Sequence, residues 1–289
     1  MPLSVLALVL AAAVIHAAWN LWIKQLGPAV RSVPLLWMLT GISAVLYAPL
    51  AAWMLGHGAW RPDRTALVWI LGSGVIHIAY FLALLRGYRA SDLSLVYPTA
   101  RGTGPLLAAF GATFLLHERP TALSISGAVL ISAGVLILTV GRDFGRTPHL
   151  RAGIGWGLLT GLSIAVYTLW DGWAVKRVGV PPLLFYWGGE VTRVLLLTPA
   201  ARGHRDGVRR LWKEQRARVL GIAVLSPLSY ILILLALRHG QVSHVAPARE
   251  ISILIGAWLG ASVLGEGERT RRLIAAFAFA AGVIALAIG

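Results

Sequence analysis

Long apolar segments dominate the chain, and short clusters of polar residues, glycine or proline separate them. Runs of about 20 apolar residues predict transmembrane α-helices. A membrane β-barrel would instead show alternating segments of about ten residues, which the sequence lacks. We therefore expect an all-α integral membrane protein. Its ten predicted spans are residues 3–24, 33–55, 65–86, 93–116, 121–140, 152–175, 181–200, 218–237, 243–264 and 271–288.

The two halves of the chain repeat each other. Each half holds five predicted spans, an odd number, so the second half must cross the membrane in the opposite sense. Such inverted repeats are common in secondary transporters, which bind substrate between the halves. We predict a first repeat at 1–140, a linker at 141–151 and a second repeat at 152–289 around a central cavity. Corresponding positions include Arg101 and Arg249, Glu118 and Glu266, VYPTAR (96–101) and VAPAR (245–249), YFLALL (80–85) and YILILL (230–235).

Composition supports the membrane class and excludes others. Hydrophobic residues make up 57% of the chain and charged residues only 13%, against roughly 25% charged in soluble domains. The net charge of +15 lies almost entirely in the predicted loops, with no aromatic-basic platform for nucleic acid. The absence of cysteine excludes disulfides, thiolate metal sites and a cysteine nucleophile.

Three segments carry a resemblance to a known family. They are HAAWNLWIK (16–24) in the first span, LLHERPT (115–121) after the fourth, and VLGEGERT (263–270) after the ninth. With the five-plus-five arrangement, this pattern resembles the EamA branch of the drug/metabolite transporter superfamily over nearly the whole chain. The resemblance implies ten helices around a central cavity and a metabolite exporter or exchanger. We expect export of a small polar, anionic or zwitterionic metabolite across a bacterial inner membrane, with import or exchange as the alternative.

Arg101 stands inside an otherwise apolar span. At 1.5 Å per residue it lies roughly 12 Å from the start of that span. An unpaired guanidinium at this depth costs at least about 2.5–3.5 kcal/mol, so Arg101 should face a wet cavity or a partner. Arg249, behind Pro247, repeats the arrangement. We predict that both arginines bind a substrate carboxylate or phosphate; the alternative is internal neutralisation, of Arg249 by Glu250 for instance.

Helix-breaking residues surround the first of these arginines. We expect them to loosen the fourth span, since irregular backbone at this depth is tolerated where it lines a cavity. They are Pro98, Gly102, Gly104 and Pro105.

Only three acidic residues fall inside predicted spans, namely Asp171, Glu190 and Glu250. We regard all three as candidates for coupling to a proton or counter-solute, and Glu250 also as a substrate ligand. Glu190 lies three positions before Arg193, so a static ion pair is its alternative role. Asp171 comes near the end of its span and could contact the membrane interface instead. Glu118 and Glu266, at helix ends, are expected to cap helices or form ion pairs.

Polar and aromatic side chains recur on single helical faces. His16 and Asn20 lie four apart beside Trp19 in the first span, and His77 lies three before Tyr80 in the third. Tyr167 occupies a similar place in the sixth span. We predict that these residues line the substrate site; bonding between helices is the alternative.

Enzyme motifs are missing from the sequence. GSG (72–74) lacks the flanking pattern of an intramembrane serine protease, no histidine pair has metal-ligand spacing with a carboxylate, and no ATPase motif occurs. We expect no enzymatic activity, metal or cofactor, and any uphill transport must draw on an ion or solute gradient. The alternative from another class is an intramembrane enzyme acting on lipid or isoprenoid phosphates.

Basic residues divide unequally between the two sides of the membrane. Seventeen Lys and Arg lie in the loops that follow the odd-numbered spans, and six lie on the side of the termini. The positive-inside rule then puts loop 201–218 in the cytoplasm and both termini in the periplasm. The family resemblance implies the reverse.

Overall fold

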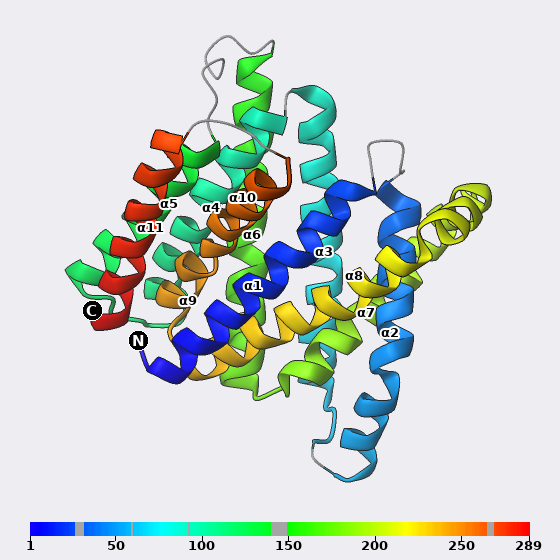
Figure 1. The fold of residues 1–289 in the computed structure, drawn as a ribbon. Helices are drawn as coiled ribbons and strands as arrows, with labels where there is room; N and C mark the ends of the chain where they lie inside the picture. The colour runs from blue at the N-terminus through cyan, green and yellow to red at the C-terminus, as the bar shows by residue number, and fades with distance from the viewer. Residues whose placement is uncertain (27–31, 59, 92, 140–148, 265–268) are drawn as a thin grey trace.

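The computed structural model describes residues 1–26, 32–58, 60–91, 93–139, 149–264 and 269–289. Within these residues the regular structure is helical, and no strand occurs among them (Figure 1). The elements are α1 (Leu3–Gln25), α2 (Ser32–Gly56), α3 (Arg64–Ala90), α4 (Leu93–Leu115), α5 (Ala122–Thr139), α6 (Leu150–Trp173) with a π-helical turn (Ala174–Val178), α7 (Pro182–Arg202), α8 (Arg205–His239), α9 (Val242–Ala248), α10 (Ile251–Leu264) and α11 (Arg269–Ile288).

Several helices have the length and composition of membrane spans. Five described segments are long and apolar enough to cross a bilayer, and α5 and α11 contain shorter apolar stretches. The expected all-α membrane architecture is confirmed. The five long segments are Leu3–Ile23, Val33–Gly56, Arg64–Ala90, Leu150–Val178 and Arg205–His239.

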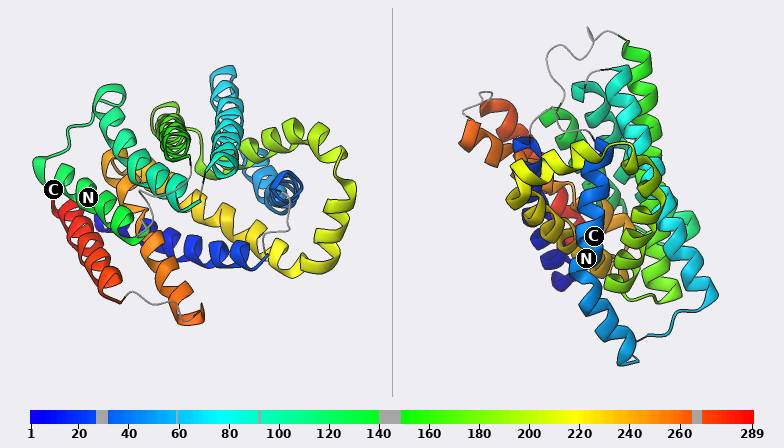
Figure 2. Two further views of the ribbon diagram at one scale, coloured as in Figure 1. Left: turned by 90° about the horizontal axis from the view of Figure 1, so that it is seen from above. Right: turned by 90° about the vertical axis from the view of Figure 1, so that its right-hand side faces the viewer.

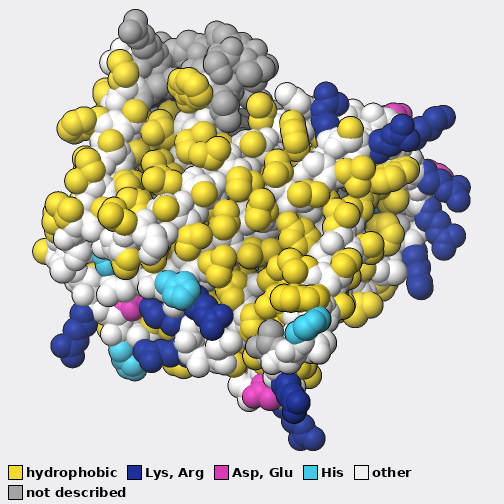
Figure 3. Space-filling view, turned by 60° about the horizontal axis from the view of Figure 1, so that its bottom comes forward, with side chains coloured by type: hydrophobic (Ala, Val, Ile, Leu, Met, Phe, Trp, Pro, Cys, Tyr) yellow, Lys and Arg dark blue, Asp and Glu magenta, His cyan; other side chains and the backbone are white. Residues whose placement is uncertain are grey.

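The outer surface is apolar over a wide area. Large side chains such as Trp258 and Phe277 are 68% and 76% exposed, and hydrophobic atoms cover most of the face in Figure 3, with Lys and Arg gathered toward its edges. A surface of this kind suits lipid tails rather than water.

The two repeats pack around a pseudo-two-fold axis. Helix α5 packs on α11 near one end of the molecule, and α2 packs on α7 near the other (Figure 1). A Cβ on Gly127 would lie 2.7 Å from the Gly282 carbonyl oxygen, and one on Gly134 would lie 3.4 Å from the Ala275 carbonyl oxygen. The two repeats are offset by 148 positions, so Gly127 corresponds to Ala275 and Gly282 corresponds to Gly134. Each of the two contacts is therefore the symmetry mate of the other.

Two predicted features of local structure are wrong. Helix α4 is continuous despite Pro98 and Pro105; Thr99 and Thr103 donate hydroxyl hydrogen bonds to carbonyl oxygens one turn earlier, as polar side chains do in proline-containing membrane helices. The ninth span instead divides into α9 and α10 at Arg249 and Glu250. Short bonds such as Glu250 N to Pro247 O, 3.0 Å, close a tight turn there.

The basic segment 201–218 differs from the solvated loop that the sequence predicts. Helix α8 starts at Arg205, and non-helical backbone at Gln215 kinks it before its apolar part. Leu211 is buried in a small apolar cluster against α2. This amphipathic packing explains why the segment is ordered. Most of the predicted linker, residues 141–148, lies outside the described residues, and α6 already begins at Leu150.

The N-terminus and the C-terminus lie next to each other. The Met1 amino group donates to the Ala287 carbonyl oxygen at 2.8 Å, and both termini lie together in every view (Figure 2). Adjacent termini are expected when the chain crosses the membrane an even number of times.

Candidate functional site

A cavity of about 720 Å³ opens between the two repeats. Its walls come from α1, α2, α3, α4, α6, α7, α8 and the break after α9. Eight of the nine predicted substrate residues line it, and the ninth, Glu250, lies directly behind two of them. The eight are His16, Trp19, Asn20, His77, Tyr80, Arg101, Tyr167 and Arg249.

Arg101 and Arg249 share one carboxylate. Arg101 Nη2 lies 2.8 Å from Glu250 Oε2, and Arg249 Nε lies 3.3 Å from Glu250 Oε1. Glu250 is fully buried, whereas the two arginines reach the cavity. Arg101 Nε has no hydrogen-bond partner among the described residues. The break between α9 and α10 turns two consecutive side chains inward, so that Glu250 meets Arg101 of α4 and Arg249 meets Tyr167 of α6.

Aromatic rings surround this charged group. Tyr167 accepts a hydrogen bond from Arg249 Nη2 at 3.1 Å, and its ring stacks on His77 with centroids 4.5 Å apart. Tyr80 meets Tyr167 edge-on at 5.4 Å. Tyr167 therefore joins the arginine side of the cavity to the histidine side.

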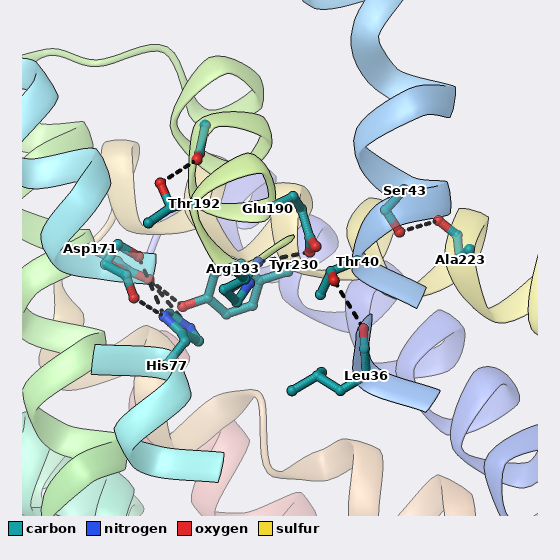
Figure 4. A network of polar contacts seen from close by, with 12 residues as sticks. Leu36, Thr40, Ser43, His77, Asp171, Glu190, Thr192, Arg193, Ala223 and Tyr230 are labelled. Atoms are coloured by element: carbon teal, nitrogen blue, oxygen red, sulfur yellow. Dashed lines mark hydrogen bonds and ion pairs between the residues drawn. The ribbon is translucent and has the colours of Figure 1, made fainter. Parts of the chain in front are cut away.

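Asp171 lies beside His77 and the hydroxyl end of Tyr230 (Figure 4). Its Oδ2 accepts a 2.6 Å hydrogen bond from the Tyr230 hydroxyl and lies 3.8 Å from His77 Nε2. Asp171 is completely buried, so the expected alternative of a contact with the membrane interface is wrong. The π-helical turn continues this helix to Val178, beyond residue 175, where the predicted span ends.

Glu190 and Arg193 form the third charged group. Arg193 Nη2 donates to Glu190 Oε1 at 2.7 Å, as the spacing of three predicts, and the guanidinium lies over the Tyr186 ring. Nearby, the Thr40 and Ser43 hydroxyls donate to backbone carbonyl oxygens (Figure 4). Three arginines and three carboxylates thus meet at one cavity, and their formal charges cancel.

Helix α1 contributes polar side chains to one part of the cavity wall. His16 and Trp19 meet edge-on with ring centroids 4.7 Å apart, and Asn20 Nδ2 donates to the His16 carbonyl oxygen at 2.7 Å. Trp19 Nε1 is buried and has no hydrogen-bond partner in the part of the chain that the structure describes.

Sequence reasoning missed several lining residues. Tyr230 was recognisable, because it opens the segment YILILL that repeats YFLALL, and it stands where Tyr80 stands in the first repeat. Tyr186 and Tyr97 also line the cavity but carry no such signal, since a single tyrosine in an apolar span is equally consistent with an interfacial position. Tyr88, another lining residue, lies outside the predicted third span, 65–86.

Glu118 lies outside the cavity and caps a helix. Its two carboxylate oxygens accept hydrogen bonds from the backbone N–H groups of Val242 and Ser243 at 2.7 and 2.9 Å, at the start of α9. Lys176 Nζ lies 3.5 Å from the same carboxylate. This contact ties the first repeat to the second. Glu266, its counterpart, lies outside the described residues.

Comparisons with known proteins agree with the duplicated architecture. The family model described as "EamA-like transporter family" matches residues 3–140 and again residues 151–288. The double match confirms two repeats. No curated protein matches the chain. One solved structure, titled "Crystal structure of protein", aligns with a TM-score of 0.80 at 16% sequence identity, over 100% of this chain and 98% of that chain. At this identity the likeness shows the fold alone.

Proposed function

Because the chain belongs to the EamA-like transporter family, we propose that this membrane transporter exports a small anionic or zwitterionic metabolite. We place it in a bacterial inner membrane, working as a secondary active carrier. An ion or solute gradient supplies the energy, since the sequence carries no ATPase motif.

The observation that supports an anionic group is the shared Glu250. Two guanidinium groups face the cavity, and one carboxylate contacts both. That cluster keeps one positive charge within the membrane, where an uncompensated cation is costly. A substrate carboxylate or phosphate completes the pairing, because arginine presents paired donors that match two oxygen atoms.

The cavity also limits the size of the substrate. About 720 Å³ falls within the roughly 300–1,000 Å³ typical of small-molecule sites. Tyr80, Tyr167 and Tyr230 provide apolar ring faces next to the charged groups. This combination suits a metabolite with one charged end and a modest apolar body.

Transport by the purified full chain in liposomes tests the proposal. We expect saturable counterflow of at least one compound from a panel of labelled amino acids, organic acids and phosphonates. Arg249→Ala should abolish it, while Arg210→Ala, at an exposed site on α8, should not. Net flux in vesicles of both orientations then separates export from import and exchange.

Two results would overturn this function. One is the absence of saturable movement across the whole panel. The other is recovery of the added compounds, or of added lipid phosphates, in chemically altered form, which would indicate an enzyme.

A further inference from the structure

Asp171 differs from the other two membrane carboxylates in its partners. Glu250 contacts Arg101 and Arg249, and Glu190 contacts Arg193. Within the described residues Asp171 has no lysine or arginine within ion-pair distance; its polar contacts are Tyr230, Ser73 and His77. A guanidinium holds a carboxylate in its charged form, so Asp171 is the carboxyl group left free to change its protonation state.

The hydrogen bonds of His77 fix which ring nitrogen faces Asp171. His77 Nδ1 lies 2.9 Å from the Ser73 carbonyl oxygen, which can only accept, so Nδ1 carries the proton. In the neutral ring Nε2 then presents a lone pair, 3.8 Å from Asp171 Oδ2. Two acceptors face each other here; one proton added to Nε2 would give an ion pair with Asp171, and a small approach of the two side chains would give a hydrogen bond.

The remaining surroundings of Asp171 leave room for this proton. Oδ1 is buried without a hydrogen-bond partner among the described residues. The Tyr230 hydroxyl from α8 and the Ser73 hydroxyl from α3 face the carboxyl group. Arg193 from α7 and Arg249 from the α9–α10 break act on it only through space. His77 is therefore the titratable base closest to it, and His77 itself lines the cavity.

We propose that His77 and Asp171 together bind one proton exchanged with the cavity, and that this proton couples transport to a proton gradient. The inference rests on the proposed transport function. The proton adds to Nε2 of His77, which then donates to Asp171 Oδ2, or it passes to the carboxyl group as a neutral acid. Release reverses the path. No other bond changes, and the charge of the pair moves between minus one and zero.

Tyr167 connects this proton to the substrate. Its hydroxyl accepts from Arg249, and its ring stacks on His77. An anion that draws Arg249 toward the cavity therefore shifts the ring that packs against the proton site. Tyr230 is a positioning residue, because its hydroxyl holds Asp171 Oδ2 in place and its ring meets His77 edge-on.

Spectroscopy on the full chain in nanodiscs tests the proton site without any substrate. Between about pH 8 and pH 5, where histidine charge changes are usually followed, we expect an infrared band of a protonated carboxyl group or a ¹⁵N signal of an imidazolium. Asp171→Asn should remove the first and His77→Gln the second. Asp206→Asn, at an exposed site, should remove neither. Absence of both signals in the unmodified chain, or their survival in both variants, overturns the proposal even if one variant misfolds.

A liposome assay tests coupling. Vesicles loaded with a pH-sensitive dye receive each compound of the same panel, and movement of a compound should carry protons with it. In Asp171→Asn counterflow should persist at a measurable rate while proton movement is lost. Proton movement that survives in this variant refutes the coupling role. If no compound moves in the unmodified chain, the proposed function fails, and the spectroscopic result still decides the proton site.

Discussion

One carboxylate, Glu250, contacts two arginines inside the membrane, so the cluster keeps one positive charge. Burying an ion pair gains little net free energy, whereas removing one partner of a buried pair costs about 3–5 kcal/mol. The arrangement therefore depends most on Glu250, whose loss would leave two guanidinium groups without a carboxylate. It also remains incomplete, because Arg101 Nε lacks a partner within the described residues.

At this site Arg101→Ala should abolish transport and lower thermal stability, because Glu250 keeps only the longer contact to Arg249 at 3.3 Å. Arg101→Lys should recover transport only in part, since an ammonium group lacks the paired donors. Transport in liposomes and thermal unfolding in detergent measure the two effects. Full transport by Arg101→Ala would make the residue structural.

The double variant Arg101→Ala/Glu250→Gln tests how far Arg249 depends on Glu250. Removing Glu250 as well leaves the buried Arg249 guanidinium without its carboxylate, so we expect the double variant to be less stable than Arg101→Ala. Transport should stay absent. A double variant that transports like the unmodified chain would contradict a role for Arg101 in substrate binding.

The sequence predicted the charged residues of the cavity better than its polar ones. Arg101 and Arg249 carry permanent charges that hydrocarbon does not tolerate, so few placements were open to them. Tyrosine can face lipid headgroups, a neighbouring helix or a cavity at similar free energy, so Tyr186 gave no signal. The burial of Asp171 was missed for another reason: the position of a residue along a span does not reveal which neighbouring helices cover it.

Among the helices, the broken ninth span has no counterpart in the first repeat. The sequences of the two repeats already differ at this point, because VAPAR is one residue shorter than VYPTAR. The deletion brings Pro247 closer to Arg249, and a tight turn replaces the helix there. Helix-breaking residues alone did not predict the outcome, since α4 contains two prolines and stays continuous.

Close packing of α5 on α11 leads to a prediction about glycine. In Gly282→Ala the new Cβ would lie 2.6 Å from Ile131 Cγ1 and 2.8 Å from the Gly127 carbonyl oxygen. We expect a loss of about 1–3 kcal/mol from overpacking. Gly155→Ala is the matched control, because nothing lies within 4 Å of its Cβ. Thermal unfolding that ranks the two variants the other way would contradict this packing.

The carboxylate of Glu118, which caps α9, leads to another prediction. Glu118→Gln keeps one acceptor oxygen but turns an amide N–H₂ toward backbone donors at the other position. We expect the variant to lose about 1–3 kcal/mol, the cost of leaving a buried donor unpaired. Amide hydrogen exchange at Val242 and Ser243 should accelerate in particular. Unchanged exchange there would show that the cap contributes nothing to the start of the helix.

For the molecule as a whole, the pseudo-two-fold relation fixes which surfaces correspond but not which side is the cytoplasm. The two repeats are alike in fold and opposite in direction, so either orientation uses the same contacts. The positive charge of the connecting segments favours one of the two membrane orientations. The basic segment of α8 from Arg205 to Gln215 carries the largest share of it.

We predict that residues 201–218 are cytoplasmic and that Gly289 is periplasmic. A C-terminal reporter that is active only in the cytoplasm should then give no signal, while the same reporter inserted after Gly207 should be active. The paired Met1 and Ala287 contact requires both termini to report the same side. A bright C-terminal fusion would reverse the orientation and leave the fold unchanged.

The cancelling charges of the cavity determine how the membrane potential acts on the carrier. Three arginines and three carboxylates give the empty site a formal charge of zero. Moving one elementary charge through 100 mV changes the free energy by about 2.3 kcal/mol. The empty carrier therefore reorients with no net electrical work, whereas a bound monoanion makes the same motion voltage-dependent. A proton bound with that anion cancels the charge again, so the voltage acts only on the partly loaded carrier.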